Sequence, residues 1–143
     1  LSKLTKHFLP MIIKAKQGGI LNVASTAAFC SGPKMAAYYG SKAYVLNLTE
    51  AIHEEVKKDG IKMSCLCPGP VKTSFQAKAG IEKSEGAKKY LMEAKDVAKE
   101  GYKGFKKGKA IIVPGIKNKF LVIINKFVPR SIVRKIVLKT NEK

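Results

Sequence analysis

Three short apolar segments, each bounded by glycine or proline, alternate with helix-like segments along this chain. They read GGILNVAS at 18–25, IKMSCLCPG at 61–69 and KAIIVPG at 109–115. Between the first two, residues 35–60 carry Val45, Leu48, Ile52 and Val56 at helical spacing and close on Asp59-Gly60. Short buried strands that alternate with helices pair in parallel. The sequence therefore predicts an α/β fold built on a parallel sheet.

Helical patterns also occupy both ends of the chain. Residues 1–16 repeat apolar side chains near a 3.6-residue period, and 93–108 reads as a polar helix. Residues 116–143 read as two basic amphipathic helices separated by Pro129. A parallel sheet of three strands is small and its edges are exposed. We therefore expect a further N-terminal part of the domain before Leu1.

The composition of the 143 residues favours one globular domain in a reducing compartment. No apolar run approaches the roughly 20 residues that span a bilayer, and no signal peptide is recognisable. Cys30, Cys65 and Cys67 form neither a C-x-x-C pair nor a metal-ligand spacing. We expect reduced thiols, no metal site and a cytoplasmic location, with Cys65 and Cys67 facing the same way on one strand.

The formal net charge is +18 and is concentrated toward the C-terminus. Residues 101–143 hold 12 basic groups and one acidic group. Such a segment can meet anionic lipid, nucleic acid or a phosphate-bearing ligand, or simply be a solvated surface. With only two arginines and no interleaved aromatics, the pattern does not favour reading of nucleic-acid bases.

Two adjacent tyrosines precede a lysine in ASTAAFCSGPKMAAYYGSKAY, residues 24–44. Residues four apart share one face of a helix, and the residue four after Tyr38 is Lys42, whereas the residue four after Tyr39 is Ala43. A catalytic tyrosine–lysine pair in this stretch must therefore be Tyr38 with Lys42. Tyr102 and Lys106 have the same spacing, so the spacing alone decides nothing.

Two further features accompany Tyr38 and not Tyr102. Ser25 lies 13 residues before Tyr38, at the end of the first predicted strand, and PGPVKT at 68–73 follows the second strand. The residue 13 before Tyr102 is Lys89. In this order, Ser25, Tyr38 with Lys42, and the PGPVKT turn resemble the short-chain dehydrogenase/reductase family over nearly the whole chain.

The resemblance implies a Rossmann-like, doubly wound parallel sheet. The Gly-rich dinucleotide turn and the Asn-Asn-Ala-Gly segment of the family are not found in this sequence. Residues 1–143 therefore resemble the C-terminal portion of a single domain of this family, and we expect this portion alone to be inactive.

By the same resemblance, Ser25, Tyr38 and Lys42 are the catalytic residues of a hydride-transfer reaction on a carbonyl or alcohol. A phenol, whose ordinary pKa is about 10, is a sluggish acid–base group at neutral pH, and a neighbouring ammonium favours its phenolate form. Lys42 lies where it can supply that charge to Tyr38 and hydrogen-bond the nicotinamide ribose. Ser25 would hold the substrate oxygen against Tyr38.

The PGPVKT turn is the candidate site for the nicotinamide ring. The resemblance implies that the backbone of Pro68 and Gly69 faces the ring and that Val71 and Thr73 hold its carboxamide. With Tyr38 and Lys42, these residues form the expected cofactor-binding set. We expect NADP in preference to NAD, because the branch of 3-oxoacyl and hydroxysteroid reductases, whose tails resemble VPRSIVRKIVLK, often uses it.

The expected partners follow from the same comparison. The substrate is a carbonyl or alcohol, hydrophobic or lipid-like, covered by the segment Ser74–Lys89. The helices 1–16 and 36–58 would pack on their copies in a homo-dimer or homo-tetramer.

Two other interpretations stay open: a basic protein that binds nucleic acid or an anionic membrane, and a catalytically inactive member of the same fold. We expect no nucleic-acid partner for the enzyme, and peripheral membrane contact of the basic C-terminus is compatible with it.

Overall fold

The computed structural model describes residues 1–73 and 91–141. Its elements follow the predicted alternation: α1 (Ser2–Ala15), β1 (Gly19–Val23), the 3-10 turn η1 (Thr26–Phe29), α2 (Ala36–Val56), η2 (Lys57–Asp59), β2 (Lys62–Leu66), β3 (Val71–Lys72), β4 (Met92–Glu93), α5 (Ala94–Lys106), β5 (Ile111–Ile112), α6 (Ile116–Asn125) and α7 (Arg130–Asn141).

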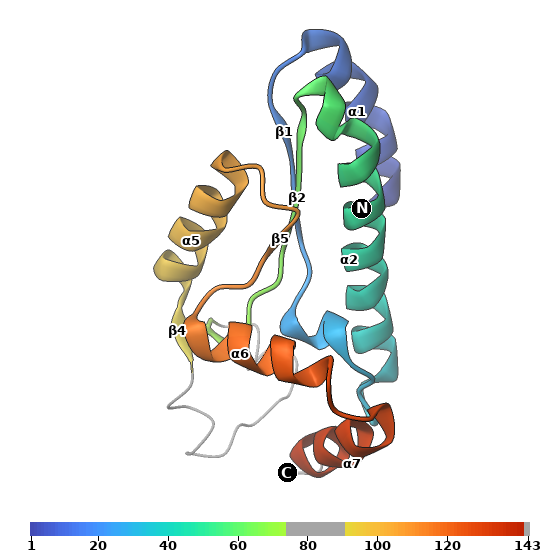
Figure 1. Ribbon diagram of the computed structural model, residues 1–143, viewed down its shortest axis with the longest axis vertical. Helices are drawn as coiled ribbons and strands as arrows, with labels where there is room; N and C mark the ends of the chain where they lie inside the picture. Colours follow the sequence, from blue (N-terminus) through green and yellow to red (C-terminus); the bar gives the residue numbers. More distant parts are fainter. Residues whose placement is uncertain (74–90, 142–143) are drawn as a thin grey trace.

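The main sheet has the order β1-β2-β5, and both pairings are parallel. β1 pairs with β2 from Gly19↔Lys62 to Val23↔Leu66. α1 and α2 lie on one side of this sheet and α5 lies on the other, while α6 crosses the carboxyl ends of the strands (Figure 1). The predicted α/β architecture with parallel strands is confirmed.

The residues of β2 alternate between the two faces of the sheet, as a strand requires. Met63 and Cys65 face α1 and α2 and are fully buried there. Leu66 faces α5, where it packs with Val97 and Ile112. β2 is therefore the central, doubly covered strand of the sheet.

The helix α2 ends as the sequence predicts, after a short 3-10 extension. Gly60 has φ 76°, a left-handed conformation that glycine adopts without strain. The buried stripe differs slightly from the predicted one: Leu46, Thr49 and Val56 are fully buried, whereas Val45 and Leu48 are half-buried. The polar Thr49 is tolerated there because its hydroxyl accepts a hydrogen bond from buried Asn22 of β1, at 3.0 Å.

A second, two-stranded sheet was not predicted. β3 pairs in parallel with β4, matching Val71 with Met92 and Lys72 with Glu93. Strands of two residues carry no periodicity that a sequence could reveal. The predicted substrate-covering segment Ser74–Lys89 lies outside the described residues. Among the helices that are described, none is both long and apolar enough to cross a membrane.

Candidate active site

Ser25 lies at the carboxyl end of β1, where the chain turns into η1. Its hydroxyl accepts a hydrogen bond from the Ala27 backbone N–H at 3.1 Å and donates one to the Pro68 carbonyl at 3.4 Å. The first is the usual N-cap interaction of a serine before a helical turn. The second ties Ser25 to the turn that follows β2.

The turn at Pro68 is fixed to the end of β1 by backbone hydrogen bonds as well. Thr26 N–H donates to Pro68 O at 2.9 Å, and Ala24 N–H donates to Leu66 O at 2.8 Å. The serine strand and the PGPVKT turn are therefore held side by side at one edge of the sheet. Ligands of open α/β sheets bind at this carboxyl edge.

Tyr38 and Lys42 share one face in the first turns of α2, as their spacing predicts. The Lys42 ammonium lies 5.7 Å from the centroid of the Tyr38 ring. It also donates to the Val23 carbonyl at 3.4 Å, two residues before Ser25. Lys42 thus links the start of α2 to the end of β1, a contact that sequence spacing could not reveal.

Tyr39 has a different environment from Tyr38, although the two rings meet edge-on with centroids 5.9 Å apart. Tyr39 lies directly on Gly32, where a Cβ would come within 2.1 Å of the ring. Burial raises the pKa of the Tyr39 phenol above its usual value. Tyr39 therefore packs against the loop that precedes α2.

Cys65 and Cys67 point the same way, with their sulfur atoms 3.7 Å apart. Both side chains are fully buried. The hydrogen bond to Cys65 and burial together raise the pKa of the Cys67 thiol. Although Cys67 directly precedes Pro68, its full burial makes it a packing residue of the core.

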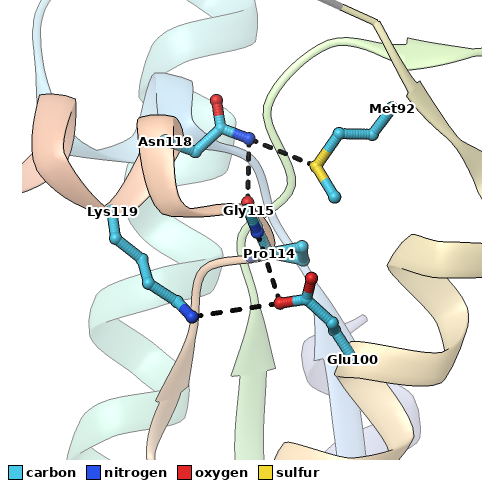
Figure 2. A network of polar contacts seen from close by, with 6 residues as sticks. All are labelled: Met92, Glu100, Pro114, Gly115, Asn118 and Lys119. Atoms are coloured by element: carbon cyan, nitrogen blue, oxygen red, sulfur yellow. Dashed lines mark hydrogen bonds and ion pairs between the residues drawn. The ribbon is translucent and has the colours of Figure 1, made fainter.

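Asn118 of α6 is a site neighbour that the sequence analysis missed. Its side-chain oxygen lies 2.4 Å from the position of a Cβ at Gly69, so a larger residue there would require Asn118 to move. Asn118 also donates to the Pro114 carbonyl at 2.8 Å and contacts the Met92 sulfur at 3.5 Å (Figure 2). Nothing in the local sequence distinguishes this asparagine, because its role depends on a turn 49 positions earlier.

The same corner holds the N-terminus of α6 against α5. Glu100 accepts a hydrogen bond from the Gly115 N–H at 3.3 Å and lies 3.9 Å from the Lys119 ammonium (Figure 2). These contacts fix α6 at the carboxyl end of β5, next to the PGPVKT turn. They position the candidate site and do not belong to it.

A cavity of about 830 Å³ adjoins this region on the Tyr39 side. It lies between the loop after β1, α2, α6 and the start of α7. Its walls include Phe29, Ala43, Val122 and Val128, with Arg130 among the polar members of the lining. None of Ser25, Tyr38 and Lys42 lines this cavity.

The groups at the carboxyl edge have the chemistry of a nicotinamide nucleoside site. An ammonium and two hydroxyls, those of Ser25 and Thr73, suit ribose hydroxyls, a carboxamide and a substrate oxygen. The hydrogen bonds above link Lys42 of α2 to the end of β1 and Ser25 to Pro68, and Thr73 follows Pro68 on the same segment. The donor set therefore fits the nicotinamide end of a dinucleotide.

The family profile described as short chain dehydrogenase matches residues 1–84. The chain belongs to this family. The match includes Ser25, Tyr38, Lys42 and the PGPVKT turn.

Curated relatives include proteins named as oxidoreductases, reductases and dehydrogenases. SadH of Mycobacterium tuberculosis is 28% identical over 138 residues, which is 89% of this chain and 50% of that protein. A very-long-chain 3-oxoacyl-CoA reductase of Coprinopsis cinerea is 44% identical over 59 residues, 41% of this chain and 17% of that protein. The chain spans about half the length of SadH and 17% of the length of the 3-oxoacyl-CoA reductase.

Solved structures of the family share this fold. A 7β-hydroxysteroid dehydrogenase superposes with a TM-score of 0.83 at 20% identity, over 94% of this chain and 53% of that one. A short-chain dehydrogenase from Sphingobium yanoikuyae in complex with NADPH superposes with a TM-score of 0.73 at 21% identity. The superposition covers 88% of this chain and 49% of that one. A family member from Burkholderia phymatum in complex with NAD superposes with a TM-score of 0.67 at 23% identity, over 83% of this chain and 50% of that one. The Rossmann-type fold class predicted from the sequence is thereby confirmed.

Proposed function

We propose that this chain supplies the catalytic half of an NAD(P)-dependent oxidoreductase that interconverts a carbonyl compound and an alcohol. The observation that carries the proposal is the position of the Lys42 ammonium, between the Tyr38 ring and the end of β1 that leads into Ser25. Family membership makes hydride transfer the expected chemistry for such a site.

In the reductive direction, Tyr38 donates the proton that the substrate oxygen needs as the carbonyl becomes an alcohol. Lys42 favours the phenolate that is left, because opposite charges stabilise each other. Ser25 donates a hydrogen bond to the same oxygen and orients it toward Tyr38. For this the Ser25 hydroxyl must exchange its 3.4 Å bond to Pro68 O for one to substrate.

A bound nicotinamide cofactor would supply the hydride. Lys42 would hold its ribose, and the segment Pro68, Gly69, Val71 and Thr73 would bind the ring and carboxamide. We favour NADP over NAD; relatives of similar fold were solved with either. No Gly-rich phosphate-binding turn occurs in residues 1–143, so the pyrophosphate needs a site outside this sequence.

We further propose a hydrophobic or lipid-like substrate and a homo-dimer or homo-tetramer. The names of the hydroxysteroid and 3-oxoacyl-CoA relatives support the first. Exposed Leu4, Phe8 and Met11 on α1 support the second, and sedimentation as a monomer at micromolar concentration would exclude it.

The proposal is tested by titrating NADPH and NADH into the full-length protein that carries this chain, and then supplying hydrophobic ketones. We expect saturable binding of one nucleotide, tighter for NADPH, and formation of alcohol in step with loss of nicotinamide absorbance. Failure of both nucleotides to bind would overturn the proposal whatever the substrate is.

A further inference from the structure

Helix α6 presents its apolar side outward and its polar side inward. Asn118 and Asn125 face the body of the molecule, where they donate to the carbonyls of Pro114 and Phe29 at 2.8 and 2.7 Å. Ile116, Phe120 and Phe127 face away from it and are 83%, 63% and 82% exposed. A helix that packs on the core of its own protein has the opposite orientation, with its apolar side inward and its polar side toward solvent.

The outward residues form one continuous stripe. Ile116, Phe120, Ile123 and Phe127 follow the i, i+4, i+7, i+11 spacing of a single helix face. We define the C-terminal apolar stripe as the exposed apolar residues of α6 and its C-terminal extension: Ile116, Phe120, Leu121, Ile123, Ile124 and Phe127. The next helix, α7, adds exposed Ile132 and Ile136. Scattered exposed apolar residues are normal, but a contiguous stripe of this kind marks an interaction surface.

The segment that carries this stripe is rich in cations, and Glu100 of α5 pairs with one of them, Lys119. Residues 116–141 contain seven basic side chains and no Asp or Glu: Lys117, Lys119, Lys126, Arg130, Arg134, Lys135 and Lys139. On a helical projection of α6, Lys117 lies on one side of the stripe and Lys119 and Lys126 lie on the other. An apolar face bordered by lysines is the pattern of a helix that lies in a membrane interface.

Two other partners could cover the stripe: a second copy of this chain, or further strands of the same sheet. Both are less compatible with the positive charge around the stripe and with its place at the carboxyl ends of the strands. A second copy in a symmetric interface would bring the same seven cations against these. Further strands of a doubly wound sheet would add along the open edge of β1, whereas α6 crosses the carboxyl ends of the strands (Figure 1). An anionic partner that also accepts apolar side chains matches both the positive charge of this segment and its exposed apolar stripe.

We propose that α6 and α7 form a docking surface for an anionic lipid bilayer. The stripe enters the headgroup region with α6 parallel to the membrane plane, and the lysines and arginines bind lipid phosphates. Nucleic acid fits less well, because it would use the cations and leave the apolar stripe in water. The surface does not depend on the proposed reaction, although it lies at the same end of the sheet as the candidate active site.

The test is sedimentation of the full-length protein with vesicles of phosphatidylcholine, with and without phosphatidylglycerol. We expect binding only to the anionic vesicles, weakened by salt. The variant Lys126→Gln, Lys135→Gln, Lys139→Gln should bind on the order of 100-fold more weakly, since each surface cation contributes about fivefold. The variant Phe120→Ser, Phe127→Ser should lose about tenfold or more through its apolar contact.

Matched controls are available on α5. Tyr102 is 63% exposed, the same fraction as Phe120, and Lys95, Lys99 and Lys103 are exposed lysines. Tyr102→Ser and a triple Gln variant of these three lysines should bind vesicles as the unaltered protein does. The proposal is overturned if the unaltered protein ignores anionic vesicles or if the α5 variants lose as much as the α6–α7 variants. It is equally overturned if only the lysine variant loses binding, since that would indicate a general polyanion surface.

Discussion

Two buried hydroxyl groups, those of Thr49 and Ser64, differ in whether they have a hydrogen-bond partner. Thr49 of α2 accepts from Asn22 at 3.0 Å and donates to the Val45 carbonyl at 2.6 Å. Ser64 of β2 is equally buried, but its hydroxyl has no hydrogen-bond partner in the described structure. The two positions therefore respond oppositely to loss of the hydroxyl.

Thr49→Val should lower the free energy of unfolding by about 1–3 kcal/mol, because it leaves the buried Asn22 amide without its acceptor. Ser64→Ala should leave that free energy unchanged or raise it by about 1 kcal/mol, because it removes a buried polar group that forms no bond. Urea unfolding of the two variants measures both effects. A Ser64→Ala variant that is as destabilised as Thr49→Val would show that the Ser64 hydroxyl does have a partner.

At the residue scale, spacing predicted the pairing of Tyr38 with Lys42 and the common orientation of Cys65 and Cys67. Both are local consequences of helix and strand periodicity. The contacts of Lys42 with Val23 O and of Asn118 with Gly69 could not be predicted. Each joins elements that only the folded chain brings together.

Among the elements, α5 approaches the sheet through glycines. A Cβ at Gly104 would lie 2.7 Å from Ile112 Cγ1, and one at Gly101 would lie 2.9 Å from Leu66 Cδ2. Both glycines are buried, and they bring the helix backbone close to β2 and β5. Gly40 of α2 has open space around its Cα, with no atom within 4 Å of an added Cβ.

Gly104→Ala should therefore destabilise the protein by about 1–3 kcal/mol, because the methyl group overpacks against Ile112. Gly40→Ala, the matched control, should stabilise it by about 0.5–1 kcal/mol through the better helix propensity of alanine. Thermal unfolding of both variants gives the sign directly. An increase in stability for Gly104→Ala would mean that α5 does not pack as closely as described.

At this scale the sequence was most informative for long elements. The apolar spacing from Val45 to Val56 and the Gly60 end predicted α2 closely, since a helix of 21 residues is long enough to show such signals. The β3–β4 pair was missed because strands of two residues are too short to show any hydrophobic period. The outward face of α6 was also missed, because an amphipathic pattern does not reveal which side meets the protein.

The candidate site belongs to the whole molecule and not to any one element. Ser25 follows β1, Tyr38 and Lys42 begin α2, and the PGPVKT turn follows β2; parallel pairing places these ends at one edge. Parallel order could be inferred from the alternation of segments, so the location of the site could be predicted. The distances within it could not be predicted, because they depend on how the elements pack in the folded chain.

The most direct measurement compares Tyr38→Phe with Tyr39→Phe in the full-length protein, by nicotinamide-coupled turnover. Both substitutions remove one hydroxyl from adjacent aromatic residues of α2, but only Tyr38 lies over the Lys42 ammonium. The account predicts that Tyr38→Phe lowers turnover by about 10²–10⁴-fold with cofactor binding retained, and that Tyr39→Phe leaves turnover nearly unchanged. Normal turnover in Tyr38→Phe would contradict it.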